Sequence, residues 1–245
     1  MRIASLLLSF TLASSALAGE IFIPATFRGP GAAGSVWRTE ISVSNITHGI
    51  HALPVPVTIA FHRNESTAEP LTVRTPLAPM EVLSIPDALH SWFDVEEGGG
   101  IVRISWDDPT ARITANARIY NLSSAGEYGQ GVPGVRVDRM VSDVFLPGIS
   151  GINGNRTNIG VFNPHNTHEL FWITLYDTSG LSRGAFATSV APRSYRQFND
   201  IFSHFQAGPL GAAMIRVTAT NNTIYAYASV VRNDTGDATF ITPAE

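Results

Sequence analysis

The chain has 245 residues and a net charge of −4, with 44% hydrophobic and 15% charged residues. This composition provides a packed core and excludes a disordered chain. The absence of Cys excludes disulfides, thiolate nucleophiles and thiolate metal sites. All 16 basic residues are Arg, which excludes lysine chemistry, and the weakly acidic charge without a basic run argues against nucleic acid as a partner.

The first 18 residues have the features of a cleavable signal peptide. Arg2 supplies a positive charge, residues 3–12 are almost entirely apolar, and Ala16-Leu17-Ala18 matches the small-x-small cleavage pattern. An N-terminal membrane anchor is the alternative, but the apolar stretch is short for a span. We therefore expect cleavage after Ala18, a periplasmic or extracellular protein, and no integral membrane segment afterwards.

Alternating apolar and polar residues predict short strands. In the first clear strand Trp37, Thr39, Ile41 and Val43 share one face, which predicts burial on that side. Similar runs follow, separated by Gly, Pro, Asn and Asp, at residues 55–61, 71–75, 101–105 and 113–120. About seven strands in each stretch of roughly 110 residues favour an all-β, immunoglobulin-like β-sandwich, with a closed barrel as the alternative.

One short crossover helix is expected in each half of the chain. Residues 86–93 begin with Pro86-Asp87 and place Leu89 and Phe93 on one face. Residues 199–205 repeat the arrangement with Asp200 near the start.

The second half of the chain matches the first in order. Residues 38–45 (RTEISVSN) align with residues 156–163 (RTNIGVFN) at an offset of 118. Weaker matches extend the alignment over nearly the whole chain after residue 18. We therefore expect two tandem sandwich domains, at 19–134 and 143–245, joined by a short polar linker at 135–142.

Three segments carry a family likeness. Trp37-Arg38-Thr39 with Asn45, the Ala78-Pro79 turn, and residues 126–133 (GEYGQGVP) resemble a tandem immunoglobulin-like repeat of exported, largely uncharacterised bacterial proteins. The second half keeps Arg156-Thr157 and Asn163 but lacks the YGQ stretch. The resemblance implies a β-sandwich in a surface or envelope setting, and it brings no catalytic residues.

Two His-x-x-His pairs, His48/His51 and His165/His168, occupy equivalent loops and offer two imidazoles each to a metal. The sequence shows no third or fourth ligand, so we interpret these residues as polar loop positions and assign no metal site. The acidic pairs, including Asp234 and Asp237, are interpreted as turn residues rather than as a calcium loop.

No pattern for a nucleophile elbow, zinc protease or phosphate loop is present. We assign no catalytic, cofactor-binding or metal residues and expect no cofactor. The recurring Arg38 and Arg156 are expected in structural ion pairs or hydrogen bonds. Asn45 and Asn163 are expected to end strands.

Several aromatic residues are candidates for a sugar-binding platform, although packing inside the fold is the more economical interpretation. They are Trp92, Trp106, Trp172, Tyr225 and Tyr227.

The sequence favours a non-enzymatic structural, adhesion or protein-interaction module of the bacterial envelope or surface, with an envelope or extracellular protein or glycan as partner. Two similar units would suit a spacer or a bivalent binder. The alternatives are a carbohydrate-binding module and an exported enzyme with its site at the inter-domain cleft. A two-domain pilus chaperone fits the size only.

Overall fold

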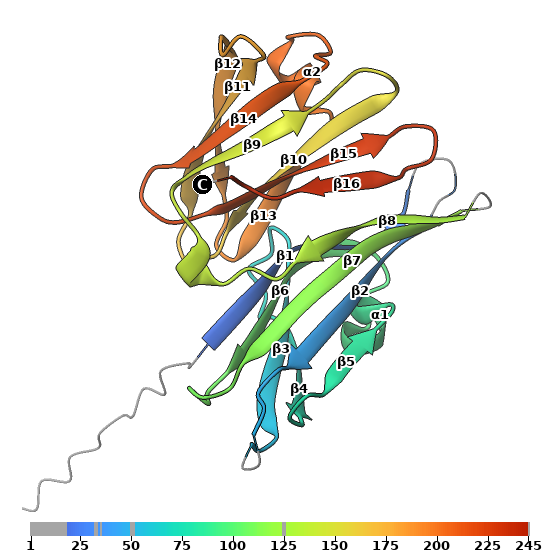
Figure 1. Ribbon diagram of the computed structural model, residues 1–245, viewed down its shortest axis with the longest axis vertical. Coiled ribbons are helices and arrows are strands. Elements are labelled where there is room, and N and C mark those ends of the chain that lie inside the picture. The colour runs from blue at the N-terminus through green and yellow to red at the C-terminus, as the bar shows by residue number, and fades with distance from the viewer. Residues whose placement is uncertain (1–18, 32–33, 35, 50–51, 124–125, 245) are drawn as a thin grey trace, which may run out of the picture.

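The computed structural model describes residues 19–31, 34, 36–49, 52–123 and 126–244, so the expected signal peptide lies outside the described residues. It is mostly β, as expected, and is built from antiparallel sheets (Figure 1). The N-terminal half contains the strands β1 (Gly19–Pro30), β2 (Val36–Asn45), β3 (Val55–Arg63), β4 (Leu71–Leu77), β5 (Val82–Ile85), β6 (Gly98–Trp106), β7 (Ile113–Ser123) and β8 (Gly126–Pro133).

The C-terminal half contains eight further strands. They are β9 (Asp143–Ile149), β10 (Asn155–Asn163), β11 (Glu169–Asp177), β12 (Ser182–Val190), β13 (Ser194–Phe198), β14 (Ala213–Ala219), β15 (Tyr225–Arg232) and β16 (Ala238–Ile241). Each half therefore has eight described strands rather than about seven, and the additional short strands include β5 and β13, which were not among the predicted runs.

The pairing order of the strands is the same in the two halves. One layer of the N-terminal half has the order β4-β3-β6-β1, and in the other layer β5 and β7 flank β2 while β8 follows β7. The C-terminal half has the corresponding orders β12-β11-β14-β9 and β13-β10-β15-β16. We call the four layers A, B, C and D in this sequence. Layers A and B are joined because β1 pairs first with β6 and then, through Gly29 and Pro30, with β2.

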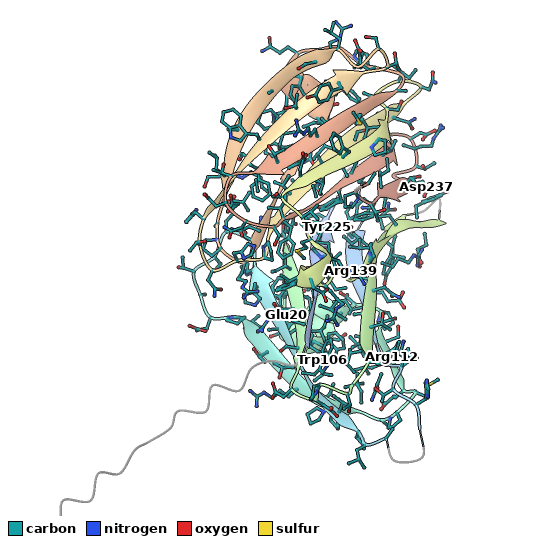
Figure 2. The ribbon with its side chains drawn as sticks, turned by 60° about the vertical axis from the view of Figure 1, so that its left-hand side comes forward. Glu20, Trp106, Arg112, Arg139, Tyr225 and Asp237 are labelled. Atoms are coloured by element: carbon teal, nitrogen blue, oxygen red, sulfur yellow. The ribbon has the colours of Figure 1, made fainter. Side chains whose placement is uncertain are left out.

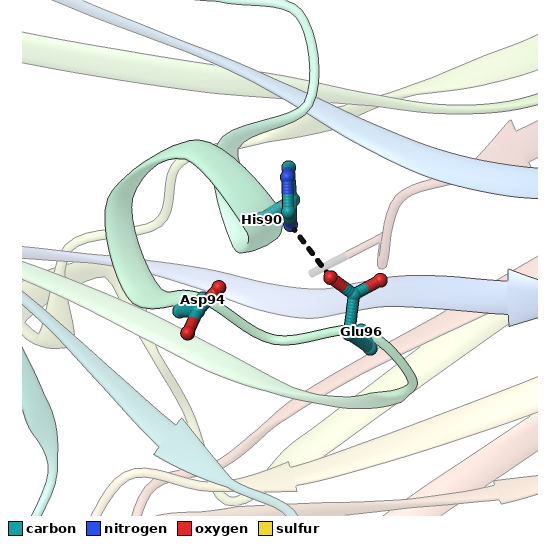
Figure 3. A group of neighbouring side chains, drawn as sticks. All are labelled: His90, Asp94 and Glu96. Atoms are coloured by element: carbon teal, nitrogen blue, oxygen red, sulfur yellow. Dashed lines mark ion pairs between the residues drawn. The ribbon is translucent and has the colours of Figure 1, made fainter.

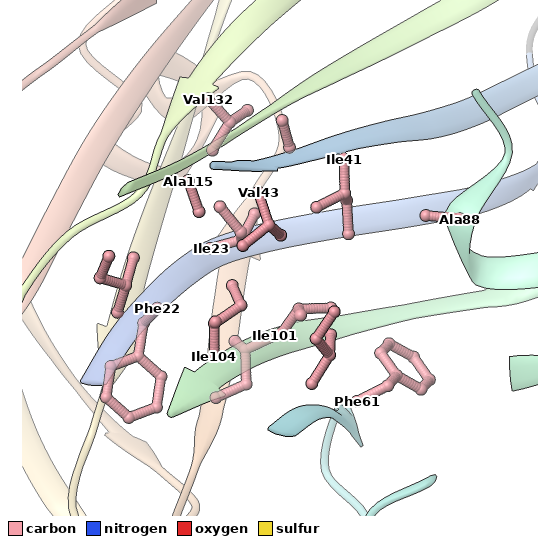
Figure 4. Packing of buried hydrophobic residues seen from close by; sticks show 14 of the residues in the cluster. Phe22, Ile23, Ile41, Val43, Phe61, Ala88, Ile101, Ile104, Ala115 and Val132 are labelled. Carbon is pink, nitrogen blue, oxygen red and sulfur yellow. The ribbon is translucent and has the colours of Figure 1, made fainter. Parts of the chain in front are cut away.

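Buried apolar side chains from layers A and B form the first core, which is sandwich-like (Figure 4). Ile23 and Ile104 come from layer A and Ile41 and Val43 from layer B, and none of the four is exposed to solvent. The alternation expected from the sequence is confirmed for Thr39, Ile41 and Val43, which are all buried. A second core fills the C-terminal half.

The expected helical turns are α1 (Ala88–Phe93) and α2 (Ile201–Phe205). The helix α1 buries Ala88, Leu89 and Phe93 in the first core. Asp87 stands at the N-cap position, but its side chain makes no capping hydrogen bond. Within the described ranges, no helix has the length and apolarity needed to cross a membrane.

Two fully buried asparagines end the equivalent strands β2 and β10, as expected. Asn45 donates to the carbonyl of Leu77 at 3.0 Å and accepts from the backbone of Thr47 at 3.0 Å. Asn163 donates to the carbonyl of Val190 at 3.1 Å and accepts from the backbone of His165 at 3.0 Å. Each side chain thereby satisfies backbone groups that the strand end would leave unpaired.

The two halves pack against each other along a seam over the outer face of layer A. Phe22 of β1 is fully buried and meets Phe162 of β10 with ring centroids 5.3 Å apart. The guanidinium of Arg193 lies 5.2 Å from the Phe22 ring. Phe162, Tyr225 and Tyr227 belong to the first core although they lie in the C-terminal half, and Figure 2 shows Tyr225 at this seam. The first core is therefore continuous across the seam.

Polar contacts hold the edges of the seam. The side-chain oxygen of Asn64 accepts hydrogen bonds from the Ser194 hydroxyl and from the backbone of Tyr195. On the opposite side, Ser229 donates to Gln130 at 2.7 Å. The connecting segment 135–142 is bonded to both halves, because Val135 pairs with Phe22 and Val141 pairs with Ile224.

A glycine of β10 allows the closest aromatic approach at the seam. A Cβ atom on Gly160 would lie 2.0 Å from Cζ of Tyr227, whose ring is stacked on Phe240 at 4.9 Å. Gly160→Ala should therefore force the tyrosine ring away and lower the free energy of unfolding by about 1–3 kcal/mol, measured by urea denaturation.

Gly131→Ala is the matched control for Gly160→Ala, because a Cβ there would meet no atom within 4 Å. Its effect should stay within about 0.5 kcal/mol. Equal effects of the two substitutions would contradict the close packing inferred at Gly160.

Candidate functional site

A cleft of about 540 Å³ lies between the two halves, and residues of both halves line it. One wall depends on an irregularity of β1. Pro24 and Ala25 together lie opposite the single residue Ile101 of β6, because the register shifts between Ile23 and Thr26. Proline has no N–H for the ladder, so a bulge is a favourable place for it. The bulge turns Ala25 and Thr26 into the cleft lining.

The wall from the N-terminal half is mostly apolar. It includes Phe27, Pro30, Trp37 and Ile119, with Gln130 of β8 as a polar member. Phe27 is fixed by Thr39, whose hydroxyl accepts from the Phe27 backbone N–H at 2.9 Å and donates to its carbonyl at 2.8 Å. Trp37 lies on the same strand face as Thr39 and packs at the margin of the first core, and it is half-buried.

The wall from the C-terminal half is polar and is formed by the outer face of layer D. Its polar members are Arg156, Asn158, Tyr195, Gln197, Asn199 and Ser229. Five of them come from the adjacent strands β13, β10 and β15, and Asn199 is the residue that follows β13. Alternation along these strands brings the polar side chains to one face, while Ile159 and Val161 point into the second core.

Among the described lining residues, Arg156 is the one charged side chain. Its Nη1 donates to Oδ1 of Asn233 at 2.6 Å. Burial raises the pKa of Tyr195 to about 12, so its hydroxyl stays protonated at physiological pH. The cleft therefore combines amides, hydroxyls and one positive charge with an aromatic wall.

Arg38 and Arg156 occupy equivalent strand positions but have different partners. Arg38 forms an ion pair with Asp87 at 3.4 Å, and Asp87 also binds Arg28 at 3.2 Å. The structural role expected for Arg38 is confirmed. Arg156 has no such carboxylate partner among the described residues, since Asp200, the counterpart of Asp87, accepts a hydrogen bond from Ser203 of its own helix. Arg156 thus remains available to the cleft.

A second cavity of about 420 Å³ adjoins Arg156 on the C-terminal half. Arg156 lines both cavities. The polar residues that line the second cavity include Asn155, Asp200, Ser203, Gln206 and Asn233. The arginine therefore stands where the inter-half cleft continues over the surface of the C-terminal half.

The structure does not assemble the His-x-x-His pairs into a three-ligand cluster among the described residues. Nε2 of His165 lies 2.8 Å from the carbonyl of Thr223, while His48 and His168 are exposed and His51 lies outside the described residues. The three-residue group that the described chain does contain is His90, Asp94 and Glu96 (Figure 3).

The His90 group is exposed and already partnered. Nδ1 of His90 lies 3.2 Å from Glu96, and the other Glu96 oxygen lies 2.9 Å from Arg28. A cation bound there would compete with Arg28 for the Glu96 carboxylate. The Asp234/Asp237 segment is a hairpin turn, as expected: Arg232 accepts from the backbone of Gly236 and donates to the carbonyl of Asp237.

The expected preference of the aromatic candidates for packing is confirmed for four of the five, because Trp92, although half-buried, packs on the first core with its ring 6.1 Å from that of Phe93. Trp106, Tyr225 and Tyr227 are 3%, 5% and 1% exposed, so they form no open platform. Trp172 is 49% exposed on the outer face of layer C. The aromatic residues that line the cleft are instead Phe27, Trp37 and Tyr195, and the sequence pattern placed Trp37 on the core face.

The sequence singled out Arg156 as recurrent and placed Trp37 and Gln130 in segments with a family likeness, but it did not bring them together. It gave no indication of Asn158, Gln197, Asn199 or Ser229. These residues alternate with core residues as ordinary outward positions of a strand do. Only the packing of the two halves distinguishes these residues as part of the cleft lining.

A scan against family models finds no match for the chain. A search of curated proteins finds no significant match. The function of the chain is therefore inferred from the geometry of the site.

The partly buried ion pairs of Asp87 predict different sensitivities for the two equivalent aspartates. Asp87→Asn removes the carboxylate that Arg28 and Arg38 share, although Arg28 keeps Glu96, and should lower the free energy of unfolding by about 1–3 kcal/mol. Asp200→Asn, the matched control, removes no ion pair and should cost less than about 1 kcal/mol. Chemical denaturation measures both, and a larger loss for Asp200→Asn would contradict the assignment.

His62 predicts a pH dependence of stability. Burial, with the nearby charges of Arg193 and Arg103, lowers the pKa of His62 from 6.5 to about 4. Below about pH 6.5 the unfolded chain therefore binds a proton at His62, whereas the folded chain does not until the pH approaches 4. The contribution of neutral His62 to the free energy of unfolding is fully present above about pH 6.5 and is lost as the pH falls towards 4.

The stability of the chain and of His62→Gln should be compared by urea unfolding between about pH 7 and about pH 4.5. The chain should lose more stability than the variant across that window. Parallel curves would show that His62 titrates normally.

Proposed function

We propose that the chain is an exported, non-catalytic binding module of the bacterial envelope or surface, and that its ligand occupies the cleft between the two halves. The observation that carries this proposal is the cleft itself. It is lined from both halves, and its volume of about 540 Å³ lies within the range of roughly 300–1,000 Å³ usual for small-molecule sites. Export rests on the signal-peptide pattern of residues 1–18.

The proposed architecture is two tandem immunoglobulin-like β-sandwich domains, 19–134 and 143–245, joined by 135–142. The identical strand order of the two halves supports this division, as do the matching Asn45 and Asn163. We infer that a single unit was duplicated and that the copies then diverged at Arg38 and Arg156. The likeness to exported bacterial repeats fits the same origin.

The chemistry of the lining supports binding over catalysis. General acid–base catalysis uses a group whose pKa lies near the working pH, most often His or a carboxylate with a shifted pKa. The described lining of the inter-half cleft offers amides, hydroxyls and Arg156 instead. His62 lies beside the arginines of the seam rather than in this lining. The enzyme alternative is therefore the weaker one.

A fluorescent probe inside the cleft tests the proposal. The chain has no Cys, so Asn199→Cys can be labelled at this exposed lining position with an environment-sensitive dye. Fractions of envelope small molecules, peptides and polysaccharides should include one that changes the dye emission in a saturable way. The same fraction should raise the midpoint of thermal unfolding of the unlabelled chain, because a ligand that binds the folded state stabilises it.

Arg74→Cys supplies the matched control, since Arg74 is an exposed residue of β4 outside the cleft lining. A response at residue 74 equal to that at residue 199 would indicate nonspecific binding. If no fraction alters either the dye emission or the unfolding midpoint, the binding function is wrong.

A further inference from the structure

The side-chain amide oxygens of the cleft already accept hydrogen bonds from other groups of the protein. Oδ1 of Asn158 accepts from the backbone of Asp200 at 3.1 Å, and Oε1 of Gln197 accepts from the Tyr227 hydroxyl at 3.1 Å. Oε1 of Gln130 accepts from Ser229 at 2.7 Å, and Oδ1 of Asn199 accepts from Gln197 at 2.8 Å. The carbonyl ends of four amides are therefore already engaged.

The donor ends of three of these amides remain available. Among the described residues, the Nδ2 groups of Asn158 and Asn199 and the Nε2 group of Gln130 donate to no protein acceptor. Arg156 adds a guanidinium of which Nη1 alone donates to a partner among the described residues. The cleft thus offers N–H donors and one positive charge, which favours a ligand rich in oxygen acceptors.

The excess of available N–H donors over available acceptors favours a saccharide over a peptide as the ligand. A peptide bound here would bring its own N–H groups against amide oxygens that each already accept one hydrogen bond and keep a single lone pair, and each N–H left buried without an acceptor costs about 1–3 kcal/mol. A sugar hydroxyl has two acceptor lone pairs and a proton that rotates to a partner or to water. It accepts from the amides without leaving a donor unpaired.

The apolar wall completes the recognition. Phe27 and Trp37 line the cleft opposite the amides of the C-terminal half. A pyranose ring carries hydroxyls at its rim and C–H groups on its faces, so it can meet polar groups edge-on while a face covers an aromatic ring. The half-buried ring of Trp37 keeps surface available for this contact.

The second cavity extends the site beyond one sugar. It shares Arg156 with the cleft and is lined by Asp200, Ser203, Gln206 and Asn233. The Asp200 carboxylate is an acceptor for sugar hydroxyls of a kind that the described lining of the inter-half cleft does not contain. Resting on the function proposed above, we propose that the ligand is an oligosaccharide that lies across both cavities, with Arg156 at their junction and one ring against Trp37.

The test is binding of the chain from residue 19 onward to an array of neutral, N-acetylated and uronic-acid-containing oligosaccharides, followed by calorimetry with the strongest binder. Trp37→Ala and Arg156→Gln should each weaken binding by about tenfold or more. Gln130→Glu keeps the acceptor for Ser229 but removes the donor, so it should weaken binding as well.

Two controls match these variants. Trp172→Ala removes an exposed tryptophan of layer C, and Arg74→Gln removes an exposed charge, both outside the cleft lining. Each should change the affinity less than about twofold. Circular dichroism of every variant shows whether it is folded, and Gln130→Glu preserves a reading if Trp37→Ala does not fold.

Other outcomes overturn the inference. Saccharide binding that is lost in Trp172→Ala but kept in Trp37→Ala would place the site on layer C. If no oligosaccharide binds while the dye at residue 199 responds to a peptide or another non-saccharide fraction, the ligand class is wrong but the binding function stands. If neither assay gives a response, both proposals fail.

Discussion

The burial of the outer face of β1 is the constraint on which the arrangement of the two halves depends. Phe22 lies on the face of β1 opposite to Ile23, yet it is fully buried because Phe162 and Arg193 cover it. Leaving such a ring in water would forgo about 1.5–3 kcal/mol of burial free energy. The same strand then bulges at Pro24 and crosses from layer A to layer B. The outer face of β1 before the bulge therefore packs in the seam, and the residues after the bulge line the cleft.

The strand order and the buried asparagines match between the halves, while the equivalent charged residues have different partners. In the N-terminal half Arg38 and Asp87 neutralise each other against α1. In the C-terminal half the equivalent aspartate turns to Ser203, and Arg156 faces the cavities. An ion pair of this kind fixes a surface, whereas an arginine without its carboxylate partner can recognise a ligand. The two equivalent arginines thus have different partners without a change of residue type.

The sequence predicted what depends on neighbours along the chain. Alternation located the strand that holds Thr39, Ile41 and Val43, and the Asn45 and Asn163 strand ends followed from local turn chemistry. The helix start expected near Asp87 is confirmed by its N-cap position, but nothing local along the chain indicated that its carboxylate pairs with Arg28 and Arg38. The cleft was not predictable in this way, since Asn158 and Gln197 differ from ordinary outward residues only in what packs above them.

A composite site has a consequence that two independent sites lack. Duplication suggested a bivalent binder that gains affinity from two separate modules. In this molecule both halves line one cleft, and Ser229 and Gln130 join its walls directly. A ligand in that cleft contacts both halves at once, so its binding free energy adds to the stability of the seam. The continuous core around Phe22 in turn holds the walls in place before the ligand arrives, which reduces the ordering cost of binding.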